Sequence, residues 1–134
     1  MYEIRRSPRL TEHELVHLFE TSWPNYAPRS FAPVLERSLA YFAAFAGRTL
    51  IGFVNVAWDG GLHAFILDTT VHPDFRRRGV ASALLGRAAE AARSKGVVWL
   101  HVDFEPEAER LYRKAGYRPT AAGVLRLQPA VGQC

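Results

Sequence analysis

The chain has 134 residues, 49% of them apolar and 22% charged, a composition that predicts one globular domain over residues 1–134. It contains no apolar run of the roughly 18 residues that a membrane-spanning helix needs and no apolar signal stretch at its N-terminus. Its single cysteine, Cys134, excludes an internal disulfide. We therefore expect a cytoplasmic protein without a membrane anchor, whose net charge of +4 at pH 7 favours an anionic ligand.

The first third of the chain predicts a short strand followed by two helices. Thr11 and Glu14 have the spacing of a capping box, in which two side chains bind the free N–H groups at a helix start. Two prolines and an asparagine then interrupt the helical pattern. The predicted elements are a strand over residues 2–6, a helix over residues 11–21, a loop over residues 22–28 and a second helix over residues 30–39.

Three apolar runs in the middle of the chain predict an antiparallel meander. They cover residues 40–46, 50–58 and 62–71. Gly47 lies in the first connection, and Asp59-Gly60-Gly61 in the second is a strong hairpin turn. These strands are expected to form the centre of one sheet.

The remaining elements complete an α/β domain. Residues 97–102 form a nearly continuous apolar run, which is typical of a buried parallel strand. The order β-α-α-β-β-β-α-β-α-β predicts a single mixed, mostly antiparallel sheet with flanking helices. Besides the strand over residues 97–102, the second half is expected to contain helices over residues 80–94 and 105–114 and one or two strands over residues 117–127.

The connection over residues 71–82, Val-His-Pro-Asp-Phe-Arg-Arg-Arg-Gly-Val-Ala-Ser, has the features of an anion site. Backbone N–H groups at a helix start have no partner within the helix and lie at the positive end of its dipole. Gly79 lets a ligand approach the backbone, and three arginines precede it. The spacing matches neither a Walker loop nor a three-glycine dinucleotide turn. We therefore predict a phosphate or pyrophosphate site.

Two motifs resemble those of the GNAT N-acetyltransferase superfamily. Arg76, Gly79 and Ala81 fill the pattern Arg/Gln-x-x-Gly-x-Gly/Ala of its acyl-CoA pyrophosphate loop. The segment 108–117, Ala-Glu-Arg-Leu-Tyr-Arg-Lys-Ala-Gly-Tyr, fills every defined position of its second motif. The order of elements also matches, so the resemblance covers essentially the whole chain. It implies a pantetheine arm between two strands that splay apart.

The resemblance implies acetyl-CoA as cofactor. It assigns to Val71 the backbone N–H that polarises the thioester carbonyl, and to Tyr112 the acid that protonates the leaving thiolate. Where many members have an asparagine, this chain has Glu105, which would be explained by a capping role at the helix start or by contact with a cationic substrate. The expected cofactor-binding residues are Thr69, Thr70, Val71, Arg76, Arg77, Arg78, Gly79, Val80, Ala81, Ser82, Glu105 and Tyr112.

The general base and the acceptor site are predicted less directly. We favour Asp68, acting on the amine directly or through water, because a carboxylate in an apolar strand must face a cleft or a partner. The aromatic residues Trp23 and Tyr26, on a proline-stiffened loop, are candidates to contact the acceptor. Other titratable groups on or beside the two splayed strands are His63, His72, His101 and Asp103.

The resulting hypothesis is an N-acetyltransferase that moves an acetyl group from acetyl-CoA to a primary amine, of a small molecule or a peptide, in a ternary complex. The position of Cys134 argues against an acyl-cysteine route. The alternatives are a non-catalytic acyl-CoA sensor or interaction module and, third, a basic nucleic-acid-binding domain. We expect no nucleic-acid or membrane partner, and no metal, since His13 and His17 lack a third ligand. The free sheet edge would allow a homodimer.

Overall fold

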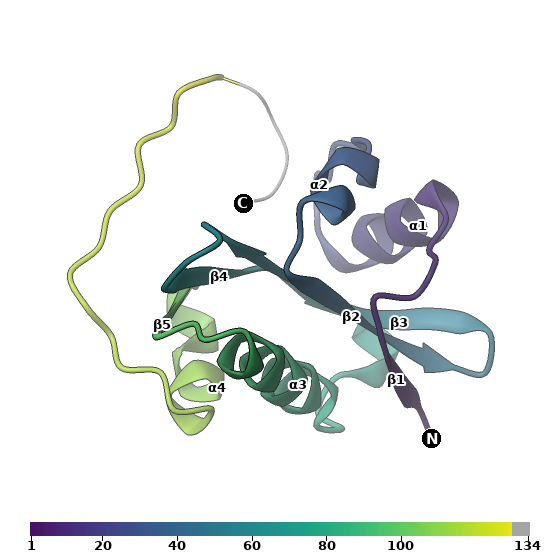
Figure 1. Cartoon of the computed structure of the whole chain (residues 1–134). Helices are drawn as coiled ribbons and strands as arrows, with labels where there is room; N and C mark the ends of the chain where they lie inside the picture. The colour runs from purple at the N-terminus through teal and green to yellow at the C-terminus, as the bar shows by residue number, and fades with distance from the viewer. Residues whose placement is uncertain (130–134) are drawn as a thin grey trace.

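The computed structural model describes residues 1–129 and contains a five-stranded sheet in the order β1-β2-β3-β4-β5, with helices on both faces (Figure 1). The strands are β1 (Glu3–Arg6), β2 (Ala40–Ala46), β3 (Thr49–Trp58), β4 (His63–Val71) and β5 (Trp99–Val102). The α-helices are α1 (Glu12–Ser22), α2 (Ala32–Glu36), α3 (Val80–Ser94) and α4 (Glu109–Lys114), and 3₁₀ turns η1 (Pro73–Phe75) and η2 (Pro106–Ala108) precede the last two.

The sheet is mixed, as predicted. Strands β1 to β4 pair antiparallel in sequence order, and β5 joins β4 in parallel after the crossover through α3. The predicted meander and the predicted parallel strand are therefore confirmed. However, β5 has only four residues, and Trp99 and His101 are exposed on it, so it is not the fully buried strand that its apolar run suggested.

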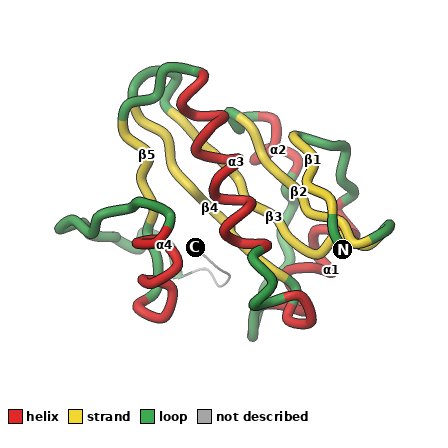
Figure 2. Tube along the Cα trace, turned by 90° about the horizontal axis from the view of Figure 1, so that it is seen from below, coloured by secondary structure: helices red, strands yellow, loops and turns green. Residues whose placement is uncertain are grey.

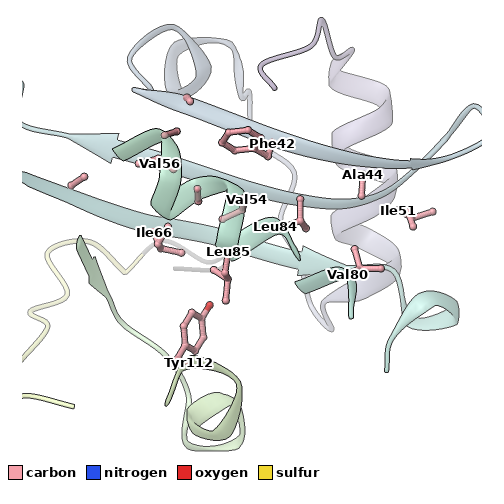
Figure 3. Packing of buried hydrophobic residues seen from close by; sticks show 14 residues of the cluster. Phe42, Ala44, Ile51, Val54, Val56, Ile66, Val80, Leu84, Leu85 and Tyr112 are labelled. Carbon is pink, nitrogen blue, oxygen red and sulfur yellow. The ribbon is translucent and has the colours of Figure 1, made fainter. Parts of the chain in front are cut away.

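Apolar side chains cover both faces of the sheet. On one face, α1 contributes Leu15, Leu18 and Phe19, which pack with Phe53 of β3. On the other face, α3 lies across the sheet (Figure 2) and its apolar side chains pack on Val54 and other core residues (Figure 3). Because alternate residues of a strand point to opposite faces, β3 serves both cores. Among residues 1–129, no helix combines the length and apolarity needed to cross a bilayer.

The start of α1 agrees with the sequence prediction, but the end of α2 does not. Thr11 and Glu14 form the predicted capping box, with the Thr11 hydroxyl 3.0 Å from the Glu14 N–H. By contrast, α2 ends at Glu36, not at Leu39 as expected. The N–H of Leu39 instead donates to the Val56 carbonyl of β3 at 2.8 Å, which already places it in line with β2 and prevents a helical bond.

The strand predicted over residues 117–127 is wrong for the described chain. This segment has no regular secondary structure, and Figure 1 shows it leaving α4 and passing outside β5. Alternating residues can form a strand only beside a free edge that pairs with them. Here no strand pairs with the outer edge of β5 within residues 1–129. The outer edge of β5 is free, but residues 117–127 do not pair with it.

Candidate active site

A β-bulge in β4 opens the sheet. Leu67 pairs with Asn55 and Thr70 pairs with Phe53, so two residues of β4 lie opposite the single residue Val54. Asp68, the first residue of the bulge, has a left-handed φ of +58°, a conformation that aspartate tolerates better than most residues. Such an insertion bends the strand and changes the direction of its side chains.

The two parallel strands separate at this bulge. Pairing between β4 and β5 stops at Ile66 and Val102, just before Asp68. Beyond that point the backbone of β4 has β3 on one side and an opening on the other. The N–H of His72 donates to Ile51 of β3 at 2.7 Å. Because N–H groups alternate along a strand, the N–H of Val71 points away from β3 and into the opening.

The start of α3 faces the same region and has uncapped N–H groups. Gly79 is its N-cap, with a φ of +80°, and has no side chain to bind the first turn. No acidic residue lies in that turn. The free N–H groups belong to Val80, Ala81 and Ser82, which the sequence predicted, and nothing lies within 4 Å of a Cβ built on Gly79. The helix start can therefore receive a phosphate group.

The three arginines of the loop have different surroundings. Arg76 Nε donates to the Val71 carbonyl at 3.1 Å, and its Nη2 donates to the Ser22 carbonyl at 3.3 Å. Arg76 thus ties the loop to the ends of β4 and α1. Arg77 has a left-handed φ of +65°, and the Arg78 guanidinium stacks 5.3 Å from the centre of the Phe75 ring. Arg77 and Arg78 are exposed and leave their charges facing solvent.

Tyr112 of α4 is the buried phenol of the site. Its residue is 5% exposed, and its ring stacks on Phe104 with centres 5.0 Å apart. Figure 3 shows the phenol oxygen pointing from α4 toward the sheet and Leu85. Burial raises the pKa of Tyr112 above 10, and the nearby Thr69 hydroxyl partly opposes this rise. Tyr112 is therefore protonated at neutral pH and can donate a proton.

Thr69 supplies an unused polar group at the opening. Its Oγ1 is buried and has no hydrogen-bond partner within residues 1–129. The Tyr112 phenol lies beside this hydroxyl, which can therefore bond either to Tyr112 or to a ligand in the opening. The hydroxyl of Thr70 is on the other face, where it accepts a 2.9 Å bond from Trp23 Nε1. Thr69 and the open N–H of Val71 therefore fit an amide-rich, thioester-bearing chain such as that of acetyl-CoA.

Asp68 lies on the opposite side of the bulge and forms an ion pair. Its Oδ1 is 3.3 Å from Arg29 Nη2, and the carboxylate is only 7% exposed. Burial raises the pKa of Asp68, while the Arg29 charge lowers it in part. The Arg29 guanidinium also stacks on Phe31, 4.9 Å from the ring centre. This partner was missed by the sequence analysis, because an arginine in a loop gives no local signal.

The predicted acceptor loop meets the bulge from the α1 side. Trp23 is bound to Thr70, so its indole is fixed against β4 and not free to enclose a ligand. Tyr26 stacks near Phe19, with ring centres 5.5 Å apart, and its buried hydroxyl has no partner among the described residues. Burial raises the pKa of Tyr26. Tyr26, Arg29 and Asp68 together form a polar group beside the opening.

Of the other titratable residues considered, His72 directly follows Val71, and His101 and Asp103 line a cleft between β5 and α3. His63, at the start of β4, has its Nδ1 2.8 Å from Nε2 of His101 in β5, but it is eight positions from Val71, roughly 26 Å along a strand. His72 accepts the Asp74 N–H and so caps η1. Asp103 is exposed just after β5. No cluster of three or more metal-ligand residues occurs within residues 1–129.

The capping role considered for Glu105 is wrong. Glu105 precedes η2 at the capping position, but its side chain makes no capping bond. The expected helix over residues 105–114 instead begins as a 3₁₀ turn and becomes α-helical only at Glu109, because Pro106 starts a tight turn. Glu105 is exposed, so its carboxylate is free to contact a ligand.

A cleft of about 1180 Å³ continues from the opening along α3. Its walls include Ser82 and Gly86 of α3, Ile66 of β4 and Phe104 after β5. The cleft therefore connects the first turn of α3, where phosphate groups would bind, with the point where β4 and β5 stop pairing. This size and shape suit an extended ligand with an anionic end.

A family model described as "Acetyltransferase (GNAT) family" matches residues 7–117 of this chain. The chain belongs to the GNAT acetyltransferase family. The match includes the bulge, the loop before α3 and Tyr112, which confirms the resemblance predicted from the two motifs. The described strands and helices likewise confirm the predicted mixed α/β sheet with flanking helices.

Individual relatives agree with this assignment. The chain is 30% identical over 115 residues to the thialysine N-epsilon-acetyltransferase of Caenorhabditis elegans, covering 78% of this chain and 71% of that protein. It spans less than half the length of the N-acetyltransferases that it matches from Pyropia yezoensis and Porphyra purpurea.

Solved GNAT structures have the same fold. A family member from Streptococcus pneumoniae superposes with a TM-score of 0.83 at 19% identity, covering 97% of this chain and all of that one. An aminoglycoside N-acetyltransferase in complex with CoA superposes with a TM-score of 0.75 at 22% identity, covering 97% of this chain and 96% of that one. At these identities the likeness is one of fold.

Proposed function

We propose that this GNAT-family chain is an acetyl-CoA-dependent N-acetyltransferase that transfers the acetyl group directly to a primary amine in a ternary complex. The observation that carries the proposal is the opening at the β4 bulge, which has the Val71 N–H and the buried Tyr112 phenol on the cleft side and the Asp68 carboxylate on the other side, next to Arg29. The CoA complex of the similarly folded aminoglycoside N-acetyltransferase supports the choice of cofactor. The amine would belong to a small molecule or a peptide.

The cofactor would be held at both ends of the cleft. The Val80, Ala81 and Ser82 N–H groups, with the exposed charges of Arg77 and Arg78, would bind its pyrophosphate. The backbone of Thr69 and Thr70 would pair with its amide groups, and the Thr69 hydroxyl offers a further bond. Bound acetyl-CoA would supply an acetyl group activated as a thioester, so that amide formation releases the CoA thiol.

The chain's own residues then have distinct tasks. The Val71 N–H donates to the developing negative charge on the acetyl oxygen. Asp68 removes a proton from the amine, directly or through water, and its raised pKa makes it a stronger base than an ordinary aspartate. Tyr112 donates its proton to the departing sulfur. No cysteine lies among residues 1–129, so an acyl-cysteine route has no nucleophile there.

A non-catalytic acyl-CoA sensor is the alternative. Such a protein would need the cleft and the α3 start but neither Asp68 nor Tyr112. The buried carboxylate, facing away from the cleft toward Tyr26 and Arg29, favours the enzyme, because a charge there serves an acceptor and not the cofactor. The proposal includes a homodimer. It includes no nucleic-acid partner and no membrane partner.

The deciding experiment is a screen of primary amines, including lysine analogues, aminosugars and peptide N-termini, with release of the CoA thiol as the readout. Mass spectrometry would identify a product heavier by one acetyl group. Thiol release that requires both the amine and Tyr112 supports the enzyme. Saturable acetyl-CoA binding with no product for any amine class would favour the sensor.

A further inference from the structure

The side of the β4 bulge away from the cleft holds one negative and one positive group. Asp68 Oδ1 lies 3.3 Å from Arg29 Nη2, and within residues 1–129 each is the other's single ion-pair partner. Glu12, an acid beside the same loop, accepts the N–H groups of Phe31 at 2.9 Å and of Ala32 at 3.1 Å, so its charge is used at the start of α2. The pair of Asp68 and Arg29 is therefore neutral as a unit.

Arg29 is held in place but keeps hydrogen-bond donors for a ligand. Its guanidinium stacks 4.9 Å from the centre of the Phe31 ring, which fixes the plane of the group. Its Nη2 bonds to Asp68, whereas a guanidinium carries five N–H donors. The side chain of Arg29 is 40% exposed, against 7% for Asp68, so the remaining donors can be reached from solvent. A carboxylate is the anion whose two oxygens match neighbouring guanidinium N–H groups.

The Tyr26 hydroxyl adds a third polar group to this place. Its oxygen is buried and makes no hydrogen bond of good geometry within residues 1–129. Burial raises the pKa of Tyr26 above 10, and the charges of Arg29 and Asp68 also act on it, so the phenol lies beside the pair. The protonated hydroxyl can therefore bond either to the Arg29 segment or to an anion that Arg29 holds.

Charge balance selects the kind of amine that fits here. A simple alkylammonium would be attracted by Asp68 but repelled by Arg29, and it would leave an uncompensated positive charge in a largely buried place. An acceptor with a carboxylate next to its amine brings one charge of each sign, so its ammonium can face Asp68 while its carboxylate faces Arg29. In an α-amino acid both groups share one carbon, and ordinary bond lengths place the nitrogen and a carboxylate oxygen about 3 Å apart. This spacing resembles the 3.3 Å between Asp68 and Arg29.

We propose that the acceptor is a free α-amino acid, whose ammonium is bound by Asp68 and whose carboxylate is bound by Arg29 and the Tyr26 hydroxyl. This inference rests on the proposed acetyl transfer, because it names the acceptor of that reaction. Arg29 is then the residue that determines specificity. A peptide N-terminus has an amide where the amino acid has its carboxylate, and an alkyl amine has neither, so both should be poor acceptors. The proposed roles of Val71 and Tyr112 are unchanged.

Matched acceptors test the carboxylate contact. Each common α-amino acid is compared with its own carboxamide, which keeps the amine and the side chain but lacks the negative charge. Thiol release is followed from about pH 7 to 9, because the amine of the carboxamide loses its proton more readily. For the best acceptor, KM should be at least about tenfold lower for the amino acid than for the carboxamide. Equal KM values, or faster acetylation of peptide N-termini or alkyl amines than of every amino acid, would overturn the inference and leave the acetyl transfer standing.

Variants of Arg29 separate recognition from folding. Above the acidic limb, Arg29→Gln should raise KM for the amino acid at least about tenfold and leave KM for the carboxamide nearly unchanged. Arg29→Lys keeps the charge and should recover part of the preference. Arg37→Gln is the matched control, because Arg37 bonds to the Pro33 carbonyl at the end of α2, and it should behave like the wild type. A preference unchanged in Arg29→Gln would overturn the inference. Melting temperatures check that the variants are folded.

Calorimetric titration of the CoA-saturated protein with the same amino acids gives a readout that needs no turnover. Binding should be saturable in the wild type, and at least about tenfold weaker for the carboxamide and in Arg29→Gln. If this pattern occurred but no amine were acetylated, amino-acid recognition would stand and the proposed transfer would fail. If no amino acid bound and none were acetylated, both proposals would be overturned.

Discussion

The carboxylate of Asp68 and the guanidinium of Arg29 lie 3.3 Å apart across 39 positions of sequence, and this pair sets the charge on the side of the opening that we propose for the acceptor. The bulge turns Asp68 toward the loop after α1, and Phe31 supports the arginine from beneath. Asp68 is nearly inaccessible to solvent, so the Arg29 cation beside it strongly influences the pH at which its carboxyl ionises.

Arg29→Gln should move the acidic limb of the pH–rate profile to higher pH. Burial raises the pKa of Asp68 and Arg29 lowers it, so loss of the arginine leaves burial less opposed. In the proposed mechanism activity needs ionised Asp68 and is therefore lost as the pH falls through the pKa of Asp68. A higher pKa makes this loss occur at a higher pH. The measurement is kcat/KM against pH with the acceptor found by the amine screen. If the acidic limb does not move, Arg29 does not influence the ionisation that controls activity.

Asp68→Asn should reduce kcat by about 100-fold or more, the usual contribution of a general base. The variant keeps the shape of the side chain but cannot accept a proton, so the acidic limb should also disappear. Acetyl-CoA affinity, measured by calorimetry, should stay unchanged because Asp68 faces the acceptor side. A variant that retains the wild-type limb would exclude Asp68 as the base.

Tyr112→Phe should lower kcat by about 100-fold while leaving acetyl-CoA affinity almost unchanged. The ring still stacks on Phe104, and only the proton donor is lost. The check is kcat together with the acetyl-CoA dissociation constant and the melting temperature. If kcat were unaffected, the phenol would be needed only for packing between α4 and the sheet.

Tyr117→Phe should stabilise the fold by about 1 kcal/mol at pH 8, because the Tyr117 hydroxyl is buried without a partner within residues 1–129. Burial raises the pKa of Tyr117 to about 12. Unfolding therefore releases its proton above pH 10, and the wild type should lose stability from pH 10 to 12, whereas the phenylalanine variant should lose less. Urea unfolding at pH 8 and pH 11 measures both effects. A less stable variant at pH 8 would indicate that the hydroxyl has a partner.

The sequence predicts the elements that local signals define. The capping box of α1, the meander and the loop before α3 could all be anticipated, because each depends on residues close in the chain. The strand after α4 could not be judged in this way. Alternation at Leu125 and Leu127 shows that a strand is compatible with the segment, but not whether the segment pairs with the free edge of β5.

The half of the proposed site that we assign to the cofactor follows from the sequence, whereas the half that we assign to the acceptor follows only in part. The residues around Gly79 and Tyr112 belong to contiguous motifs, so their types and spacing identify them. The bulge at Asp68 depends on the register between β3 and β4, which no local pattern encodes. Consequently the sequence indicated Asp68 as a base but not its pairing with Arg29, nor the unpartnered hydroxyl of Thr69.

The most direct test of the cofactor site is calorimetric titration of the purified protein with acetyl-CoA, comparing the wild type with Gly79→Asp and Gly47→Asp. Both glycines have a left-handed φ, +80° and +60°, and neither has an atom within 4 Å of an added Cβ. The two substitutions therefore add the same charge and similar backbone strain, but only Gly79 lies at the start of α3. Gly47 is in the turn between β2 and β3, outside the α3 start.

We predict saturable binding by the wild type and Gly47→Asp, and an affinity lower by about tenfold or more in Gly79→Asp, because a carboxylate would replace the anion that the helix start accepts. Equal affinity in all three proteins, or no binding by the wild type up to millimolar acetyl-CoA, would contradict the assignment of this cleft to the cofactor.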